Sequence, residues 1–531
     1  MSQLLTVLVA GHRGAPRLPA GPAREQLFAR LETVITACGG DDRRLRLLTG
    51  MAPGTDTAVA DIAQRQCLPL HQLGPGGPEP LTPPQQTAER VVWLGAPDVC
   101  LHADEPLSIR DEVALSFADL VIVLWDGAAP AGIAGGTVRL AFQAAQMMKP
   151  LLWLDTQGEV RLLDRTRLTP ARLAHLRTPH PDPALLRDLF TPPLAPAALP
   201  QALGAEIAAD LHPVDDAVPG ATASDSGAVL QNRRQHASAA ARRWGQRHRW
   251  FSWLSYLAAA LAVFAAVAGA IGLWPGGHGH GWAITELVLI TAIVAGVTLA
   301  KRRDWHGRWI SQRFIAEQLR YLRPCLPMLA IPEHFREPVW RVKDGTLDLV
   351  SPELRYLQRT LSLAGLPQAE GGTPYLPATL SAQQAQLARL REEVAGQRRY
   401  HAAKHHQLHR QHVILHRTAL ILFVLTFGAV LLHFVLHAAW LLIFTAFGPA
   451  LAAALHGIGV KLEIGRLAGQ SHAAEQELAA LLATLDAFTP EATWEGWLRL
   501  RQLTLTAAQV MSRENIQWQE LLSHQSAELP A

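Results

Sequence analysis

Three short glycine-rich segments near the N-terminus combine flexible backbone with groups that can bind an anion. They span residues 11–14 (Gly-His-Arg-Gly), residues 50–56 (Gly-Met-Ala-Pro-Gly-Thr-Asp) and residues 135–137 (Gly-Gly-Thr). Each is followed by a stretch with a helical pattern, and the N-terminus of a helix directs N–H groups and a positive dipole at phosphate. Arg13 adds a guanidinium that suits bidentate contact with phosphate. Together they predict a site for a nucleotide-like ligand.

Glycines have a plainer explanation, because they also close the tight turns of any fold that alternates strands and helices. For one loop alone we would favour that explanation. Three loops at one edge of a sheet, with an arginine among them, favour the ligand site instead. The predicted binding residues are Gly11, His12, Arg13, Gly14, Gly50, Met51, Ala52, Gly54, Thr55, Asp56, Asp126, Gly135, Gly136 and Thr137.

A run of histidines, HAAKHHQLHRQHVILH (residues 401–416), is the other pattern that could do chemistry. Its members near one helix face, at spacings that could chelate a metal ion, are His401, His405, His409, His412 and His416. No carboxylate or cysteine accompanies them, and the segment is basic. We therefore interpret them as a surface that faces lipid headgroups or a neighbouring helix, and we predict no metal site.

The segments that must position the glycine loops alternate between strand-like and helix-like patterns. Apolar, β-rich runs occupy residues 4–10, 46–49, 120–125 and 150–155, with amphipathic helices between them. Continuous apolar strands that alternate with helices indicate a parallel, doubly wound α/β sheet of the Rossmann-like type. Ligands bind such sheets beyond the carboxyl ends of the strands, where all three glycine-rich segments fall.

The same loops carry a family resemblance. G-H-R-G after the first strand, G-M-A-P-G-T-D-T-A after the second, and A-D-L-V-I-V-L-W-D-G with the later G-G-T and K-P-L-L-W-L resemble the SLOG superfamily. That group of Rossmann-like domains includes the LONELY GUY nucleotide phosphoribohydrolases and the DNA-processing Smf proteins. The resemblance covers roughly residues 4–155 and implies a nucleotide or ADP-ribose-type ligand. It places that ligand near Arg13, Gly50, Gly54, Asp56, Asp126, Gly135, Gly136 and Thr137.

One departure from the resemblance bears on catalysis. Hydrolase members carry P-G-G-x-G-T-x-x-E, whose glutamate serves N-glycosidic bond cleavage. Here Thr137 is followed by Val-Arg-Leu-Ala, and the helix through Met148 contains no acid. An oxocarbenium-like transition state would therefore lack its carboxylate. We expect a sensor with no catalytic residue and no required cofactor; a hydrolase that uses Asp126 or Glu112 is the alternative.

Two long segments almost without charge predict four transmembrane helices. Residues 418–460 contain no Lys, Arg, Asp or Glu, and residues 250–300 contain only Glu286. That glutamate either lines an aqueous pathway or reaches the outer headgroups. Each segment has room for two spans of about 20 residues. The expected spans are residues 251–274, 282–300, 418–436 and 438–460.

Charge and composition suggest where such a protein would lie. Basic residues flank both segments and are missing from both hairpin turns, which places the turns outside and both termini in the cytosol. The four cysteines form no C-x-x-C pair, which fits a reducing compartment. A net charge of +3 gives no argument for nucleic acid as a partner. A multi-pass protein of the bacterial inner membrane, with the lipid bilayer as its partner, is the simplest interpretation.

The membrane region has patterns of its own, R-W-I-x-x-R-F-I-A-E-Q-L-R at residues 308–320 and a closing helix with Glu514 and Trp518. These resemble the SLATT domains, two-span modules associated with SLOG and nucleotide-synthase partners. The resemblance implies a pore-forming membrane effector of bacterial antiphage or conflict systems. The second hairpin departs from it, and is either a duplication or a second half beyond an insertion. Small residues on the first and fourth spans indicate either an oligomeric pore lining or packing within one protomer.

The expected organisation has five parts. They are a ligand-binding domain (residues 1–160), a Pro/Ala-rich linker (161–230), SLATT-like helices with the first hairpin (231–330), a soluble insertion (331–396) and a second hairpin with C-terminal cytosolic helices (397–531). The leading hypothesis is a ligand-gated membrane effector that assembles as a homo-oligomer. The alternatives are a membrane-anchored nucleotide hydrolase and a passive scaffold that docks a protein partner.

Overall fold

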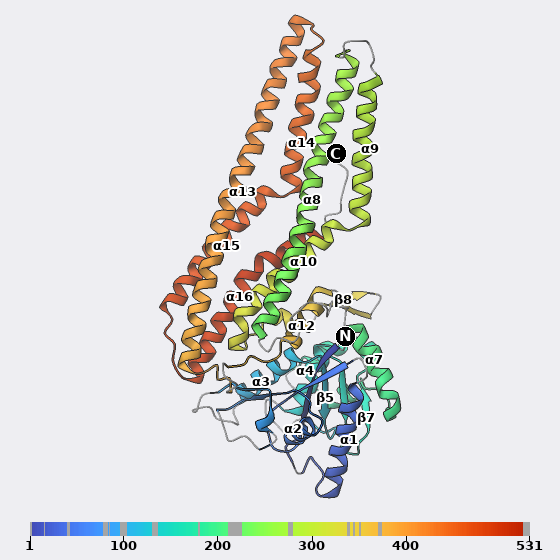
Figure 1. Cartoon of the computed structure of the whole chain (residues 1–531), viewed down its shortest axis with the longest axis vertical. Helices are drawn as coiled ribbons and strands as arrows, with labels where there is room; N and C mark the ends of the chain where they lie inside the picture. Colours follow the sequence, from blue (N-terminus) through green and yellow to red (C-terminus); the bar gives the residue numbers. More distant parts are fainter. Residues whose placement is uncertain are drawn as a thin grey trace. The chain divides into compact units, whose positions relative to one another are not determined.

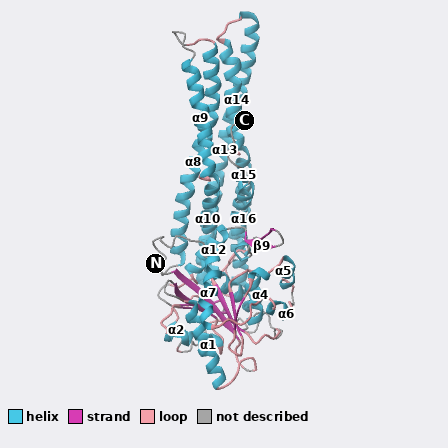
Figure 2. Ribbon diagram, turned by 90° about the vertical axis from the view of Figure 1, so that its right-hand side faces the viewer, coloured by secondary structure: helices cyan, strands magenta, loops and turns pink. Residues whose placement is uncertain are grey.

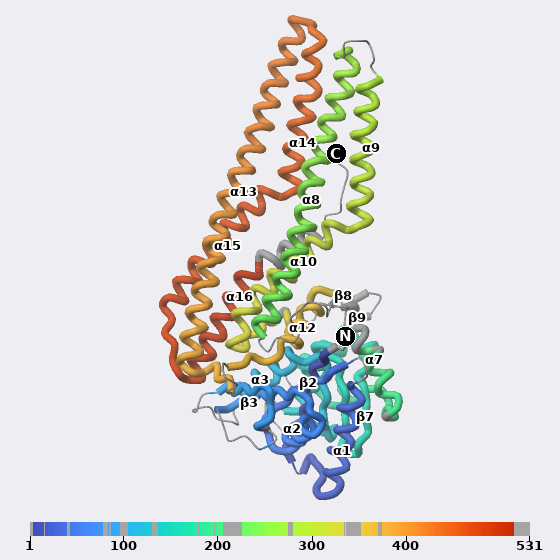
Figure 3. Tube along the Cα trace, viewed as in Figure 1, coloured from blue at the N-terminus to red at the C-terminus, as the bar shows by residue number. Residues whose placement is uncertain are grey.

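The computed structural model divides the chain into two compact units whose segments interleave along the sequence (Figure 3). It describes residues 3–14, 16–39, 43–77, 83, 85–95, 104–129, 136–178, 181–210, 226–273, 280–336, 340–343, 346–349, 352–369 and 374–523. The first unit, the head, comprises Met1–Arg234, Gln318–Leu390 and Phe488–Gln509. The second, the helical unit, comprises Gln235–Glu317, Arg391–Ala487 and Val510–Ala531. The head thus draws on three parts of the sequence, well beyond the expected limit at residue 160.

A seven-stranded sheet forms the centre of the head (Figure 1, Figure 2). Its strands are β1 (Gln3–Gly11), β2 (Arg43–Thr49), β3 (Leu70–Gly74), β4 (Arg90–Trp93), β5 (Leu120–Leu124), β6 (Leu151–Leu154) and β7 (Val160–Leu162). Their order across the sheet is β4-β3-β2-β1-β5-β6-β7, and every neighbouring pair is parallel except β6 and β7. The order reverses at β1, because β2 to β4 follow on one side and β5 to β7 on the other.

Helices cover both faces of this sheet. Leu5, Val7 and Val9 of β1 join a core with helices α1 (Pro22–Cys38), α2 (Thr55–Arg65) and α7 (Leu199–Asp210). On the other face, which Leu8 occupies, β1 is contacted by α3 (Asp104–Phe117) and α4 (Thr137–Gln146). All five residues of β5 are fully buried, as expected for a parallel strand covered on both sides. The predicted α/β domain with a mainly parallel sheet is confirmed.

The first part of the expected linker folds onto the head. After β7 it contains the 3-10 helix η2 (Arg165–Arg167), α5 (Pro170–Leu176), α6 (Pro183–Arg187), the 3-10 helix η3 (Pro196–Ala198) and α7. Thr169 and Asp182 cap α5 and α6 through their side-chain oxygens, and each helix begins with a proline. Leu186 and Leu203 are fully buried. The prolines therefore start helices here, although their abundance suggested a linker. Residues 211–225 lie outside the described residues.

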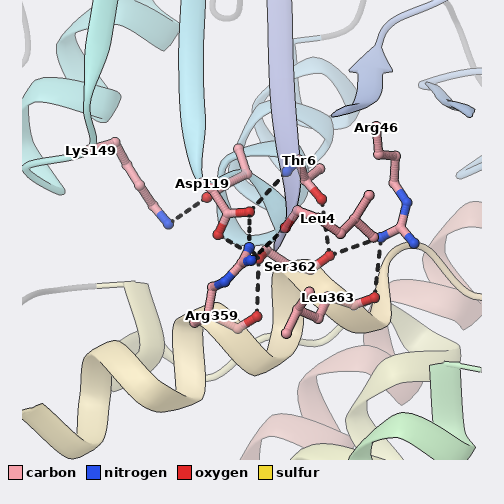
Figure 4. A network of polar contacts seen from close by, with 9 residues as sticks. Leu4, Thr6, Arg46, Asp119, Lys149, Arg359, Ser362 and Leu363 are labelled. Atoms are coloured by element: carbon pink, nitrogen blue, oxygen red, sulfur yellow. Dashed lines mark hydrogen bonds and ion pairs between the residues drawn. The ribbon is translucent and has the colours of Figure 1, made fainter. Parts of the chain in front are cut away.

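Part of the expected soluble insertion also belongs to the head. It contains α11 (Glu333–Arg336), a hairpin of β8 (Trp340–Lys343) and β9 (Thr346–Leu349), and α12 (Pro352–Ala364), and the 3-10 helix η4 (Leu326–Met328) precedes it. The last turn of α12 lies at the amino ends of the strands, the edge opposite the glycine loops (Figure 4).

Two sets of buried polar contacts hold α12 at this amino edge. In the first, Arg359 donates to Asp119 Oδ2 at 2.5 Å and to the carbonyl of Leu4, while Ser362 Oγ donates to Asp119 Oδ1 at 2.5 Å. Asp119 also accepts a hydrogen bond from the Thr6 backbone N–H at 2.9 Å. The carboxylate is thus surrounded by donors from both β1 and α12.

The second set satisfies the C-terminal carbonyls of α12, which have no partner within the helix. Arg46 Nη1 donates to the carbonyls of Ser362 and Leu363 at 3.1 and 3.2 Å. Arg90 Nη1 donates to the carbonyl of Ala364 at 2.9 Å. Both arginines are buried, so these guanidiniums act as internal caps of the helix.

The helical unit is built from long helices. They are α8 (Ser226–Ala270), α9 (His280–Arg302), α10 (Trp305–Cys325), α13 (Leu380–Leu436), the π-helix η6 (Ile443–Phe447), α14 (Gly448–Lys461), α15 (Ile464–Ala487) and α16 (Trp494–Ser523). Residues 226–234, 318–325, 380–390 and 494–509 of these helices belong to the head. Among the described residues, four helical segments are long and apolar enough to cross a membrane. Leu287, Phe434 and Val435 are among the large apolar side chains that these segments expose. Each segment overlaps one of the four predicted spans, although three of them extend well beyond the predicted bounds.

Small residues in these segments allow close packing within the chain. A Cβ atom on Gly457 of α14 would lie 2.5 Å from the ring of Tyr256 in α8, and one on Gly448 would lie 2.4 Å from Thr426 Oγ1 in α13. Ala452, which the sequence placed on the small-residue face of the fourth span, is fully buried. For these residues the structure therefore shows packing within one protomer.

Candidate ligand-binding site

The glycine loops surround a cavity of about 260 Å³ in the head. Its wall is formed by residues 8–13 at the end of β1, by the loop from β2 to α2, by one side of α3 and by the first residues of α4. These segments meet because the carboxyl ends of neighbouring parallel strands lie at one edge of the sheet. Eight predicted residues line the cavity: Gly11, His12, Arg13, Gly50, Ala52, Asp56, Gly136 and Thr137.

The other predicted residues have different positions. Met51 packs near Gly74, and the Gly14 carbonyl accepts hydrogen bonds from the backbone N–H groups of Arg17 and Leu18. Gly54 and Thr55 pack against the first loop, and Asp126 contacts His12. Gly135 lies outside the described residues.

Three glycines are required by contacts between the loops themselves. A Cβ atom on Gly11 would lie 2.4 Å from Thr55 Oγ1, and one on Gly50 would lie 2.5 Å from Asp56 Oδ2. Gly54 has a φ of +96°, and a Cβ there would lie 2.4 Å from the carbonyl oxygen of Arg13. Thr55 donates from both N and Oγ1 to the His12 carbonyl, at 3.3 and 3.0 Å. These glycines thus bring the first two loops together and fix the position of Arg13.

Gly136 is different, because its surroundings are open. It has a φ of +122°, which favours glycine, yet an added Cβ would meet no described atom within 4 Å. Gly136 is the N-cap of α4, and its backbone N–H donates to Asp111 Oδ2 at 3.3 Å. The N-terminus of α4 therefore opens on the cavity, and a carboxylate of the protein already lies there.

Charged side chains in the cavity wall are mostly positive. Four arginines line it (Arg13, Arg17, Arg110 and Arg139), together with two carboxylates, Asp56 and Asp111. Arg13 and Arg139 are exposed at the surface. With His12 neutral, this composition favours an anionic ligand, and the dipole of α4 acts in the same direction.

A buried ion pair from α3 forms one side of the cavity. Arg110 donates from Nε and Nη2 to Asp111 Oδ1, at 2.9 and 2.5 Å, and Asp111 is only 1% exposed. Burial alone would lower the pKa of Arg110. The carboxylates of Asp111 and Asp56 have the larger combined effect and raise this pKa. Sequence reasoning missed this pair. Its only signal was the charged run Arg-Asp-Glu in a segment that is otherwise mostly apolar, IRDEVALSF.

Asp56 shapes the second loop from inside. Its carboxylate accepts hydrogen bonds from the backbone N–H of Ala52 at 3.0 Å and from Thr49 Oγ1 at 3.1 Å. Burial raises the pKa of this carboxyl, against the effect of the nearby Arg110. Asp56 therefore holds the loop closed around the end of β2 while lining the cavity.

His12 and Asp126 form a contact at the cavity rim. The backbone nitrogen of Asp126 lies 3.3 Å from His12 Nε2. Asp126 Oδ1 lies 3.2 Å from the same ring nitrogen, and Arg17 Nε lies 3.8 Å from Asp126 Oδ2. Burial lowers the pKa of His12 in spite of the neighbouring Asp126. Asp126 thus positions His12 and Arg17 and does not line the cavity itself.

Glu112, the other carboxylate considered for catalysis, points to a different partner. Its Oε1 accepts a hydrogen bond from Arg501 Nη2 of α16 at 2.7 Å, and Arg501 is buried. Glu112 is absent from the lining of the cavity. Its neighbours Arg110 and Asp111 face the cavity, so the three consecutive charges of α3 point to two different sides of the helix.

The histidine run of α13 packs partly against α15 within the helical unit. His405 Nδ1 lies 2.8 Å from the Ala468 carbonyl, and the rings of His405 and His472 are 4.8 Å apart. Among the described residues, no three His, Cys, Asp or Glu side chains are arranged to hold a metal ion. For His405, the interpretation as an interhelical surface agrees with these contacts.

The chain matches no protein-family model, no curated protein and no solved structure.

Proposed function

We propose that this protein is a ligand-gated membrane effector. A SLOG-like, doubly wound head binds a nucleotide-like anion of the ADP-ribose type and controls a SLATT-like membrane unit that opens a pore. The observation that carries the proposal is the cavity wall, in which four arginines and the N-terminus of α4 face two carboxylates. A phosphate-bearing ligand is the chemistry that such a surface favours.

The position of the cavity supports a nucleotide-like ligand. It lies at the carboxyl ends of β1 and β2, beside the strand at which the order across the sheet reverses. In open α/β sheets this reversal leaves a crevice, since the loops on its two sides diverge toward opposite faces. Helices on both faces support the doubly wound description.

The carboxylates around the cavity support binding without turnover. Asp111 is paired with Arg110, Asp56 accepts from Thr49 and Ala52, and Glu112 is paired with Arg501. A general acid or base must be free to exchange a proton with the substrate, which a carboxylate held by several donors does poorly. This favours a sensor over a nucleotide hydrolase.

The helical unit supports the membrane part of the proposal. Four segments suit membrane crossing, and we place them in the bacterial inner membrane with both termini cytosolic, as a homo-oligomer. Four of the five boundaries between the units fall inside helices, namely α8, α10, α13 and α16. A ligand that binds the open state about 100-fold more tightly than the resting state would supply about 2.7 kcal/mol for gating through these connections.

Mass spectrometry of small molecules released from the purified full-length chain tests the proposal. We expect an intact phosphate-bearing molecule in the wild type and much less in Arg13→Ala. Arg24→Ala, an exposed arginine of α1 away from the cavity, is the matched control and should retain it. Liposomes carrying the wild type should leak when that molecule is added. A nucleotide that is consumed would favour the hydrolase, and a co-purifying protein with an empty cavity would favour the scaffold.

A further inference from the structure

Helix α3 lies between the ligand cavity and the first turns of α16. One side of it contributes Leu107, Arg110 and Asp111 to the cavity wall. Its other side contacts α16 through Glu105, whose Oε2 accepts from Trp494 Nε1 at 3.2 Å, and through the ion pair of Glu112 with Arg501. Within each helix the two contact residues are seven positions apart. The pairs therefore form a regular seam of two helical turns within the head.

Asp111 occupies the donors that an anionic ligand would need. One of its oxygens accepts from Arg110, and the other accepts from the backbone N–H of Gly136 at the N-terminus of α4. A guanidinium and a helix-terminal N–H are the groups with which proteins bind phosphate. With 1% of its side chain exposed, Asp111 has to move before a phosphate oxygen can reach both donors.

We infer that the Asp111 carboxylate is an internal stand-in for the ligand's phosphate, and that its displacement is the signal which α3 passes to α16. This inference rests on the proposed function, because it needs an anion in the cavity. Asp111 and Glu112 are adjacent on one rigid helix, so a shift that removes the Asp111 carboxylate from Gly136 also moves the Glu112 carboxylate against Arg501. Residues 510–523 of α16 belong to the helical unit, so the chain itself carries the change onward.

The burial of Arg501 makes this seam sensitive to a shift of α3. Arg501 is buried, its guanidinium lies 5.9 Å from the ring centre of Trp497, and Trp497 is fully buried. A buried guanidinium tolerates the loss of its carboxylate poorly. Separation of the seam therefore requires Arg501 to keep its other partner, the Leu329 carbonyl, to which its Nε donates at 3.4 Å.

Amide hydrogen exchange on the full-length chain in detergent, with inorganic pyrophosphate as the probe, tests the relay. Saturating pyrophosphate should raise exchange in residues 494–509 of the wild type by roughly tenfold, the loss of one charge-assisted contact. Asp111→Asn should bind pyrophosphate roughly tenfold more tightly and show the raised exchange without it. Glu112→Gln should bind pyrophosphate with wild-type affinity, but its exchange in residues 494–509 should be raised equally with and without the probe.

Glu32→Gln is the matched control, because Glu32 pairs with Arg65 at 2.7 Å elsewhere in the head. This variant should leave the pyrophosphate affinity and the exchange in residues 494–509 unchanged. If it raises the exchange in α16, the increase in the other variants reflects a general loss of stability of the head and not the relay. Exchange in β5 reports whether the head is folded; if Asp111→Asn loosens β5 as well, the Glu112→Gln result alone decides. Pyrophosphate that binds without changing exchange in α16 would overturn the relay and leave the proposed function standing. Pyrophosphate that binds neither the wild type nor Asp111→Asn would overturn both.

Discussion

Both edges of the central sheet hold a group of arginines; the group at one edge is buried, whereas the group at the other includes exposed arginines beside the ion-paired Arg110. At the amino edge, Arg46, Arg90 and Arg359 are buried and donate to carbonyls or carboxylates of the protein. At the carboxyl edge, Arg13 and Arg139 are exposed beside a cavity. The same residue type thus stabilises the fold at one edge and is available to a ligand at the other.

This difference shows what decides the role of an arginine near a sheet edge. A buried guanidinium must have its hydrogen bonds satisfied by the protein, so its removal mainly affects stability. A solvent-exposed guanidinium contributes little to stability and can exchange water for a ligand anion. Substitutions at the two edges should therefore separate cleanly into effects on unfolding and effects on binding.

The largest effect is expected at the amino edge. Arg359→Ala would leave Asp119, which is 9% exposed, with only the Thr6 N–H and the Ser362 hydroxyl as donors. We expect a loss of about 3 kcal/mol in the free energy of unfolding of the head, the lower end for a broken buried pair. Amide exchange in β1 and β5 measures it, with Arg24→Ala as the control. If Arg359→Ala is as stable as Arg24→Ala, the buried arginine of the amino edge contributes no more to stability than an exposed surface arginine.

The contacts of Arg359 with Asp119 could not be predicted from the sequence, although other features could. The apolar run of β5, the glycine loops at the carboxyl ends of the strands and the four apolar segments follow from local patterns, and the structure places them as predicted. The contact of Arg359 with Asp119 joins residues 240 positions apart, and no periodicity within one segment reports such a pairing. Arg110 and Asp111 escaped for a similar reason, since only the packing of α3 turns them toward the cavity.

Glycine and proline have packing roles in the head that composition alone does not show. Pro170 and Pro183 begin short helices of the head, although a Pro-rich stretch is typical of a linker. The glycines of the first two loops were assigned to ligand approach, yet Gly11, Gly50 and Gly54 each face an atom of the protein within 2.5 Å of an added Cβ. A sequence motif gives the residue type that a site needs but not which neighbour imposes it.

The next largest effect is expected at Gly54, and a comparison with Gly21 separates contact with a neighbour from backbone strain. Gly54→Ala would strain a backbone with φ +96° and push the new methyl group against the Arg13 carbonyl. We expect a loss of about 2–3 kcal/mol in the free energy of unfolding, together with weaker pyrophosphate binding because Arg13 moves. Gly21→Ala is the matched control, since Gly21 also has a positive φ (+59°, with ψ −140°) but open space around an added Cβ, and it should lose less, about 1–2 kcal/mol, because backbone strain alone opposes the alanine. Equal losses would show that the contact with Arg13 is unimportant.

Arg13→Ala should have the converse effect at the carboxyl edge. Stability of the head should stay unchanged, whereas affinity for inorganic pyrophosphate should fall by about tenfold because one charge-assisted contact is lost. Isothermal titration of the full-length chain measures the affinity, and Arg24→Ala should bind as the wild type does. If the variant binds pyrophosphate normally but unfolds more easily, Arg13 stabilises the fold as the arginines of the amino edge do, and the two edges do not differ in this respect.

The smallest effect is expected on the pH dependence of stability, through His71 at the amino edge and His12 at the carboxyl edge. Burial lowers the pKa of His71 well below its usual value, with Arg46 and Arg90 acting in the same direction, although Glu89 lies 3.8 Å from its ring. Burial also lowers the pKa of His12, but there Asp126 opposes the shift while Arg17 adds to it. Both folded-state values lie below the unfolded value of about 6.5. Acidification therefore protonates the unfolded chain first.

The sign of the expected pH effect follows from this order. Stability from the neutral histidines is fully present above about pH 6.5 and is lost as the pH falls toward each folded-state pKa, by at most about 1.4 kcal/mol per pH unit and histidine. The slope of unfolding free energy against pH, measured between pH 6.5 and 5, should decrease strongly in His71→Gln and only slightly in His12→Gln. The smaller change at His12 follows from its carboxylate neighbour and its position at the cavity rim. If His12→Gln removes as much of the slope as His71→Gln, His12 is as closed off from water as His71, and a ligand that reaches Arg13 would still have to open the cavity before contacting His12.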